Sequence, residues 1–315
     1  MTNYLISWRK DSGQGVPGYD VSTTPAYMEI ADGDTTYDLT KQKNVDVWLA
    51  DLKKAGSMVL VFVHGFHNNA ADVLVRHNAI KRNLPPGCSL VSFDWASGNP
   101  GFPPKKAYFA DKDNATKTAP YLMSSCLQQL TDPSQFGSQR VHLFAHSMGA
   151  YLTETAFQAP KAIKINHVLM AAACVDQNNY QAGSTPLTNF LGKCVDLTAY
   201  WSVDDKALPE AGQWESYTPL GLKGFPGSSI PGSCYGLICA PYYEKYVTPK
   251  SPEMSHVWYI LFEQNNAFYT DMSEVLRGVS TTPTRARTSV PNSFQLLQPA
   301  EVEVASRRET ALHRT

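Results

Sequence analysis

The feature that most constrains this chain is an apolar run, Val141 to His146, that ends abruptly at a serine between small residues. A small-x-Ser-x-Gly pattern after such a run marks a sharp strand-to-helix turn that lifts a serine Oγ out of the backbone. Ala145 holds the first small position, where glycine is usual, and Gly149 lets the following helix approach the sheet closely. Because helix-forming residues follow, the sequence predicts a nucleophile elbow with Ser147 at its tip.

Length and composition predict one large folded unit. A chain of 315 residues, 43% hydrophobic and 17% charged, can bury a single large core. We expect one catalytic domain over residues 1–279. The net charge of -1 gives no electrostatic reason to propose nucleic acid or an anionic membrane surface as the main partner, and the oligomeric state stays open.

The compartment is inferred from the amino terminus and the cysteines. The first residues as given lack the basic segment, apolar stretch and cleavage site of a signal peptide. The longest apolar runs, Met58 to Val63 and Leu169 to Val175, are too short to cross a bilayer. The six cysteines are thinly spread, which favours a reducing compartment, so we predict a cytoplasmic location. A short-loop disulfide between Cys234 and Cys239 is the alternative.

Strand-like and helical segments alternate along the chain, which predicts an α/β fold with a mostly parallel central sheet and helices on both faces. The predicted strands are Tyr4 to Trp8, Ser57 to Val63, Ser89 to Trp95, Arg140 to Phe144, Ile165 to Met170 and Asp196 to Tyr200. The predicted helices are Val45 to Lys54, Ala70 to Asn83, Pro120 to Leu130, Met148 to Gln158 and His256 to Asn265.

Two regions break this alternation. Pro209 to Pro252 is rich in Gly, Pro, Ser and Tyr, so we expect a long ordered excursion, either a lid or pocket wall or a surface loop without a catalytic role. Ser280 to Thr315 is dominated by Thr, Ser, Pro, Arg and Glu and cannot bury enough apolar area to offset its ordering entropy. A disordered tail over residues 280–315 is predicted there, although Phe294 to Leu297 could dock.

A serine hydroxyl needs a histidine to accept its proton and a carboxylate to orient that histidine. In elbow-type enzymes the acid and then the histidine follow the serine along the chain. Only His167, His256 and His313 follow Ser147. His313 lies in the predicted tail and His167 opens the next strand, so His256, at a predicted loop-to-helix junction, is the candidate base.

The acid should lie at the carboxyl end of a strand, where sites in such sheets are built. The strand that begins at Asp196 ends in two carboxylates, Asp204 and Asp205. We choose Asp205, with Asp204 and Asp176 as rivals, because triad geometry does not fix the spacing along the chain.

Attack on an acyl carbon places negative charge on oxygen, which needs backbone donors aimed in advance. The residue after the nucleophile supplies the Met148 N–H, and the loop after the early strand supplies the second, the Phe66 N–H. Gly65 allows that loop to turn tightly, and His64 is expected to hold the loop without touching substrate. His146 is expected to pack under the elbow.

The sequence gives no sign of a metal or cofactor. Two pairs of histidines have ligand-like spacing, but no carboxylate or cysteine completes a ligand set. There is no phosphate-binding loop, and no G-x-G-x-x-G follows a strand. We therefore predict no cofactor and no metal, with a small-molecule substrate as the partner.

With these motifs the chain resembles the α/β-hydrolase superfamily, and within it an esterase/lipase-like bacterial family of largely uncharacterised enzymes. The resemblance runs from about Ser57 to about Ile260 and implies an α/β-hydrolase fold, with Asp205 as acid and His256 as base. Cys174 departs from the pattern, because similar sequences often have an acidic residue there. The matching segments are Val61 to Asn69, Phe93 to Gly98, Phe144 to Ala150, Leu169 to Asp176 and Tyr200 to Leu208.

Three functions compete. The first is a serine hydrolase that cleaves a carboxylic ester through an acyl-enzyme on Ser147, as in carboxylesterases and lipases. The second is an acyltransferase that uses the same triad, and the third is a non-catalytic binding protein that keeps the fold. The acyl and alcohol groups of a substrate are not specified by the sequence.

Overall fold

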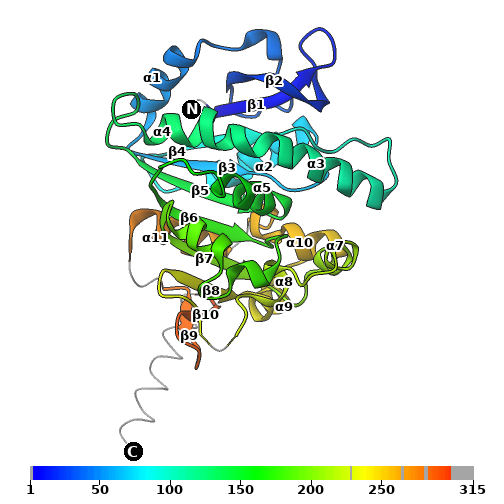
Figure 1. The fold of residues 1–315 in the computed structure, drawn as a ribbon, viewed down its shortest axis with the longest axis vertical. Coiled ribbons are helices and arrows are strands. Elements are labelled where there is room, and N and C mark those ends of the chain that lie inside the picture. Colours follow the sequence, from blue (N-terminus) through cyan, green and yellow to red (C-terminus); the bar gives the residue numbers. More distant parts are fainter. Residues whose placement is uncertain (1–2, 228, 264–265, 280–282, 299–315) are drawn as a thin grey trace, which may run out of the picture.

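The computed structural model describes residues 3–227, 229–263, 266–279 and 283–298. Within these residues ten strands form one sheet in the order β2-β1-β4-β3-β5-β6-β7-β8-β10-β9 (Figure 1). The strands are β1 (Asn3–Asp11), β2 (Pro17–Ile30), β3 (Met58–Val63), β4 (Cys88–Asp94), β5 (Arg140–His146), β6 (Ile165–Ala171), β7 (Cys194–Trp201), β8 (Cys234–Ile238), β9 (Arg285–Arg287) and β10 (Ser293–Leu296).

The sheet is mostly parallel, as predicted. Every neighbouring pair from β1 to β10 is parallel, and only the outermost strands, β2 and β9, run antiparallel to their neighbours. Parallel sheets must be covered on both faces, so their strands read as continuous apolar runs. The α/β-hydrolase fold expected from the sequence is therefore confirmed.

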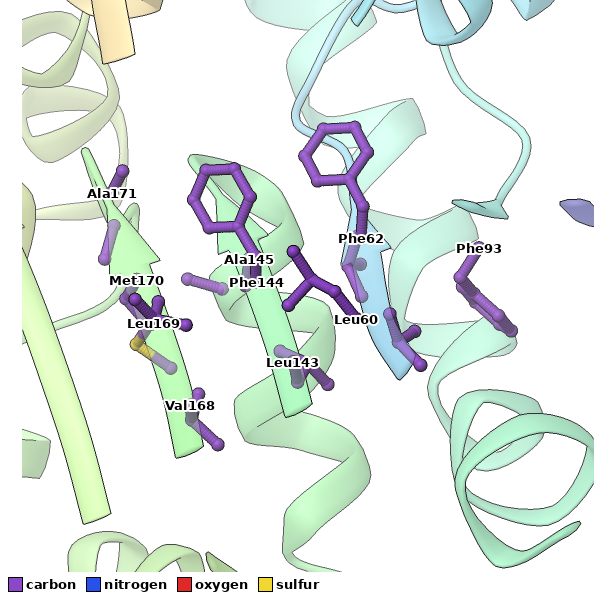
Figure 2. Packing of buried hydrophobic residues seen from close by; sticks show 14 of the residues in the cluster. Leu60, Phe62, Phe93, Leu143, Phe144, Ala145, Val168, Leu169, Met170 and Ala171 are labelled. Carbon is purple, nitrogen blue, oxygen red and sulfur yellow. The ribbon is translucent and has the colours of Figure 1, made fainter. Parts of the chain in front are cut away.

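The core lies at the centre of this sheet. All six residues of β3 are buried, and the side chains of Phe62 on β3 and Phe144 on β5 stack with 5.4 Å between their ring centroids. Figure 2 shows these rings beside residues of β6 such as Leu169. Tight packing here fixes the carboxyl ends of β3, β5 and β6, from which the candidate site is built.

Helices cover the two faces as chain connectivity requires. The crossover from β3 to β4 runs in one direction along the sheet and those from β4 to β5 and β5 to β6 run in the other. Right-handed crossovers therefore place α2 on one face and α3 and α5 on the opposite face, where α3 and α5 pack together (Figure 1). The helices are α1 (Val45–Ala55), α2 (Ala70–Arg82), α3 (Pro104–Leu122), α4 (Gln128–Thr131), α5 (Met148–Phe157), α6 (Thr185–Leu191), α7 (Leu208–Glu215), α8 (Leu220–Lys223), α9 (Ala240–Tyr246), α10 (Pro252–Leu261) and α11 (Ala267–Arg277), with short 3-10 turns at Leu39–Lys41 and Gln177–Tyr180.

The helix predicted from Pro120 to Leu130 is longer than expected. It begins at Pro104 and continues through a π-helical segment, Met123–Leu127, into α4. Pro120 lies inside α3, although proline lacks the N–H that an interior helical position donates. The sequence therefore suggested a helix start at a proline that the helix in fact tolerates.

The excursion from Pro209 to Pro252 is largely regular structure. It contains most of α7, all of α8 and α9, and the strand β8, which pairs with β7 on one side and β10 on the other. A five-residue strand between Gly- and Pro-rich segments has little periodicity to reveal it. Cys234 is the first residue of this strand and Cys239 directly follows its last; both are free thiols, so the alternative of a disulfide between them is wrong.

The prediction of a disordered tail is wrong for residues 283–298, whereas the alternative that Phe294 to Leu297 could dock agrees with the structure. Ser293–Leu296 forms β10 beside β8, Arg285–Arg287 forms β9, and Leu296 is fully buried. Arg285 also donates to both carboxylate oxygens of Asp271, at 2.7 and 2.9 Å. Composition alone did not predict that this segment is ordered, because the groups that stabilise it lie elsewhere in the chain. They are the edge of β8 and the carboxylate of Asp271. Residues 299–315 lie outside the described residues.

Candidate active site

The predicted elbow is present. Ser147 lies between the end of β5 and the start of α5, with φ 56° and ψ -123°. A positive φ is rare for a residue with a side chain and marks a sharply turned, strained backbone. Hydrogen bonds hold this turn, because the Ser147 N–H donates to Ala171 O at 3.1 Å and the Cys174 N–H donates to Ser147 O at 3.1 Å.

Close approach explains the glycines on either side of Ser147. A Cβ on Gly149 would lie 2.2 Å from the carbonyl oxygen of Val63, so α5 could not pack against the end of β3 with any other residue there. A Cβ on Gly65 would lie 2.8 Å from the Cβ of Ser147. Gly65 does not have a positive φ, so proximity to the nucleophile, and not a tight turn, requires glycine at this position.

His256 and Asp205 meet across 51 positions of sequence. The distance from His256 Nδ1 to Asp205 Oδ2 is 2.7 Å, and the carboxylate is fully buried. Asp205 Oδ1 accepts from the N–H groups of Ala207 and Leu208, at 2.9 and 3.0 Å. Both carboxylate oxygens are thus occupied, and one of them faces the imidazole.

The acid loop is also joined directly to the helix that carries the histidine. The Lys206 N–H donates to Ser255 Oγ at 2.9 Å, and that hydroxyl donates in turn to Pro252 O at 2.6 Å. Helix α10 begins at Pro252, so His256 lies on its second turn and not at the loop-to-helix junction that the sequence predicted. The bond from the neighbouring Ser255 fixes the position of His256 relative to Asp205.

The other candidates lie elsewhere. Asp176 caps a 3-10 turn and accepts from the Asn178 N–H at 2.9 Å. Among the described residues Asp205 is the only one of the three acids bonded to His256. His167 contacts Asp196 at 2.7 Å, near the amino ends of β6 and β7, and His313 lies outside the described residues.

Ser147 and His256 line one cavity of about 130 Å³ at the carboxyl edge of the sheet. Helix α7 forms one wall, so the start of the 209–252 region contributes to the pocket. A larger cavity of about 620 Å³ lies at the amino ends of β3 and β4, far along the strands from this chemistry, and none of the predicted site residues lines it. The side chains of the smaller cavity that the sequence did not predict for it are Asn68, Arg76, Ala207, Leu208, Glu210, Ala211, Trp214 and Val257.

The sequence allowed five aromatic residues as pocket walls or as ordinary packing, and of these Tyr108 lines this cavity, whereas Phe102, Tyr235, Tyr242 and Tyr243 do not. Its hydroxyl lies 3.4 Å from the Sγ of Cys174, which also lines the cavity. Burial raises the pKa of the Cys174 thiol, so this group is neutral. Cys174 thus occupies the position of the expected acidic residue with an uncharged side chain.

Two backbone N–H groups are available beside the serine. Phe66 lines the cavity, and Met148 is the first residue of α5. Neither N–H has a hydrogen-bond acceptor among the residues that the structure describes. Asn68 holds the loop around Phe66, because its Nδ2 donates to Gly65 O at 2.9 Å and to Phe66 O at 2.8 Å. This arrangement suits an oxyanion.

His146 lies under the elbow, as expected. It is buried, and its Nε2 lies 3.0 Å from the carbonyl oxygen of His256. Burial lowers the pKa of His146 well below its ordinary value, so the neutral ring donates its Nε2–H to that carbonyl. His146 therefore contributes to holding α10 against the elbow.

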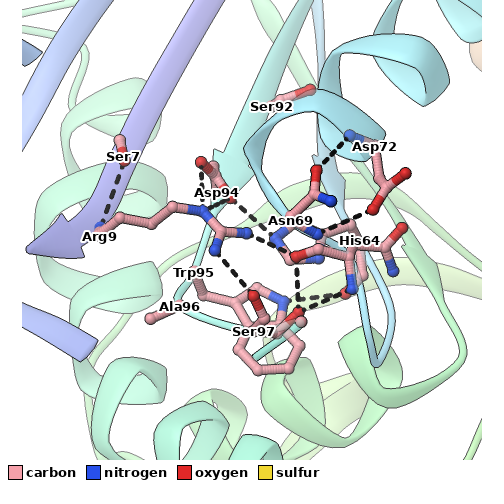
Figure 3. Close-up of polar contacts among 12 residues, drawn as sticks. Ser7, Arg9, His64, Asn69, Asp72, Ser92, Asp94, Trp95, Ala96 and Ser97 are labelled. Atoms are coloured by element: carbon pink, nitrogen blue, oxygen red, sulfur yellow. Dashed lines mark hydrogen bonds and ion pairs between the residues drawn. The ribbon is translucent and has the colours of Figure 1, made fainter. Parts of the chain in front are cut away.

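A buried ion pair supports the loop from below (Figure 3). Arg9 Nε donates to both oxygens of Asp94, at 2.8 and 3.0 Å, and Arg9 Nη2 donates to Asn68 O at 2.7 Å. The ring of His64 lies between Asp94 Oδ1, at 3.1 Å, and Gly65 O, at 3.0 Å. His64 thus holds the loop, as the sequence indicated, but Arg9 and Asp94 were not foreseen.

Removal of the Asp94 carboxylate should destabilise the protein strongly. Burial alone would raise the pKa of Asp94, but Arg9, His64 and Tyr37 together hold it below its ordinary value. Asp94→Ala leaves a buried guanidinium unpaired, so we expect the free energy of unfolding to fall by about 3–5 kcal/mol in urea titrations. The surface control Asp113→Ala should change it by less than about 0.5 kcal/mol.

The stabilisation that Asp94 provides should be lost as the pH is lowered. Since the pKa of Asp94 is lowered in the folded protein, its contribution is present above the ordinary aspartate value and disappears as pH falls through the folded value. Equal urea midpoints for Asp94→Ala and Asp113→Ala at neutral pH would contradict this role.

The solved structures that are similar to this chain are distant from it. Three of them have low sequence identity and TM-scores below 0.5, so no conclusion about this protein rests on them. The curated proteins give no match. The structures are a hormone-sensitive lipase from a metagenome library (15% identity, 87% of this chain and 88% of that chain, TM-score 0.40), an esterase of Pyrobaculum calidifontis (12%, 71% and 77%, 0.37) and a lipase-esterase related protein from Clostridium acetobutylicum ATCC 824 (12%, 72% and 96%, 0.34).

A family model covers more than half of the sequence. Residues 41–214 match the model described as "Alpha/beta hydrolase of unknown function (DUF900)". The matched stretch contains the elbow serine and the acid that contacts His256, and His256 itself follows it. The chain is a member of this α/β-hydrolase family.

Proposed function

We propose that the protein is a serine hydrolase that cleaves a carboxylic ester through an acyl-enzyme on Ser147. The observation that carries the proposal is the 2.7 Å contact between His256 Nδ1 and Asp205, made by a histidine that lines the same cavity as the serine. A buried carboxylate in this position keeps the proton on Nδ1, so Nε2 is free to accept one.

The proposed reaction has two halves. His256 Nε2 takes the proton of Ser147 Oγ as the oxygen attacks the ester carbonyl, and the N–H groups of Phe66 and Met148 hold the resulting oxyanion. The intermediate then expels the alcohol, which receives the proton from His256. In the second half a water molecule, deprotonated by His256, attacks the acyl-enzyme and releases the acid and the free serine.

Two further expectations accompany this reaction. The cavity of about 130 Å³ is smaller than the roughly 300–1,000 Å³ of sites for larger ligands, which favours short acyl and alcohol groups. None of the helices in the described part of the chain has the length and apolar character needed to span a membrane. The cytoplasmic location stays a prediction from the sequence.

Covalent labelling tests the proposal. A fluorophosphonate should modify the protein once, and peptide mass mapping should place the adduct on Ser147. Ser147→Ala should abolish labelling and the turnover of short p-nitrophenyl esters, while Ser134→Ala, at an exposed position, should retain both. Absence of both labelling and turnover in the unsubstituted protein would reject the hydrolase and favour a binding protein.

A further inference from the structure

One charged side chain of the cavity has no part in the reaction described above. Arg76 is on α2, the helix that follows the Phe66 loop, and it lines the same cavity as Ser147 and His256. Helix α2 packs against α10, which carries His256. A cation therefore lines the same cavity as the candidate nucleophile and base.

The guanidinium of Arg76 is poorly satisfied within the protein. Its Nη1 donates to Asp72 O at 3.2 Å, whereas its Nε is buried and has no hydrogen-bond partner. No ion pair among the described residues includes Arg76, and an oxygen of the nearby Asp72 carboxylate accepts from the Asn69 N–H at 3.0 Å in the cap of α2.

Two other arginines whose guanidinium groups are largely buried each have a carboxylate partner, unlike Arg76. Arg9 contacts both oxygens of Asp94, and Arg285 contacts both oxygens of Asp271. Burying a cation costs free energy that a paired carboxylate largely offsets. Burial lowers the pKa of Arg76, and Asp72 and Glu253 partly oppose that change, but the group remains cationic at neutral pH because its ordinary value is so high.

The surroundings of Arg76 favour an anion as its partner. The one carboxylate among the residues that line this cavity belongs to Glu210 of α7, which is exposed to solvent. A planar guanidinium that lines the cavity and has no ion-pair partner among the described residues matches a carboxylate in both geometry and charge. A substrate carboxylate would supply the acceptor that the protein does not.

We infer that Arg76 selects esters that carry a carboxylate close to the ester bond, so that the substrate is a small anionic ester. This inference rests on the proposed function, since it names the substrate class of the same site. Arg76 binds and orients the substrate, and the bond-breaking steps remain those of Ser147, His256 and Asp205.

Matched ester pairs test the inference. In each pair a terminal methyl group of the neutral ester is replaced by a carboxylate: 4-acetoxybutanoate against butyl acetate carries the charge on the alcohol side, and ethyl hydrogen succinate against ethyl butanoate carries it on the acyl side. The measured quantity is the ratio of kcat/KM for the anionic ester to that for its neutral partner, followed by pH-stat. The unsubstituted enzyme should prefer the anionic member of at least one pair, and the pair that shows this identifies the side.

Arg76→Gln should lower that ratio by about 10–100-fold, the usual range for loss of a charge-assisted hydrogen bond. Arg76→Lys should retain part of the preference. The control is Arg82→Gln on the same helix, whose side chain contacts Glu263 at the surface and does not line the cavity, and it should leave the ratio unchanged.

The possible failures are distinguishable. If the unsubstituted enzyme is labelled on Ser147 and cleaves the neutral esters but shows no preference in either pair, the inference about Arg76 is wrong and the proposed hydrolase stands. An unchanged ratio in folded Arg76→Gln has the same meaning. If Arg76→Gln does not fold, two measurements on the unsubstituted enzyme replace it. A preference for an anionic ester together with competitive inhibition by succinate that is stronger than inhibition by 1-butanol supports the inference, and absence of either contradicts it. Absence of labelling and of turnover rejects the proposed function itself.

Discussion

Replacing His256 with alanine is expected to lower kcat for a short ester by about 10⁴- to 10⁶-fold. Without an imidazole the Ser147 hydroxyl keeps its proton at neutral pH and is a weak nucleophile. The loss should appear in single-turnover as well as steady-state rates, because both halves of the proposed reaction need His256 to carry a proton. The measurement is ester hydrolysis by the purified variant, with circular dichroism to establish that it is folded.

The control for this variant is His167→Ala. His167 also contacts a carboxylate, at 2.7 Å, but near the amino ends of the strands, so we expect kcat within a few-fold of the unsubstituted enzyme. The double variant Ser147→Ala with His256→Ala should be no slower than Ser147→Ala alone, because groups that act as one unit are not additive. Near-normal turnover by His256→Ala would remove this residue from the mechanism.

Asp205→Asn should reduce kcat by about 10⁴-fold, and the hydrogen bonds around Asp205 explain why so small a change has this effect. Oδ1 accepts from two backbone N–H groups, so the amide oxygen of asparagine must take that position. Its NH₂ group then faces His256 Nδ1 and donates to it, which moves the ring proton to Nε2. A ring protonated on Nε2 cannot accept the proton of the serine.

Asp176→Asn and Asp204→Asn are the matched controls for the acid. Asp176 accepts from the Asn178 N–H in a 3-10 turn, and asparagine also serves in such a cap, so kcat should change only a few-fold. Asp204 has no bond to His256 among the described residues. If Asp176→Asn is crippled and Asp205→Asn is not, the assignment of the acid is wrong.

The central strands and the elbow could be predicted because their chemistry is local. Met58–Val63 is an uninterrupted apolar run, and a strand covered on both faces requires one. The motif around Ser147 specifies a turn that only small neighbours permit, and Gly149 meets that requirement. The contact between Asp205 and His256 was also anticipated, since it depends on chain order and on the common edge at which parallel strands end.

What was missed depends on partners that are distant in the sequence. Docking of Phe294 to Leu297 was named only as an alternative to a disordered tail, because β8, the strand whose edge buries Leu296, was itself hidden within a Gly- and Pro-rich segment. Strand β2 (Pro17–Ile30) is half exposed at the other edge, so it lacks an apolar run. Arg76 did leave a local signal, because it lies on the helical face that Val73 and Ile80 bury, where a cation is out of place.

The position of Arg9 has a practical consequence for anyone who trims this protein. The guanidinium that neutralises Asp94 comes from β1, ahead of the stretch shared with the family, and His256 comes after that stretch. A shortened version that begins at residue 41 would lose the first two strands of the sheet. It would also lose Arg9, the guanidinium that pairs with the buried carboxylate of Asp94. Expression of the shared stretch alone should therefore yield aggregated material, and its inactivity would carry no information about the enzyme.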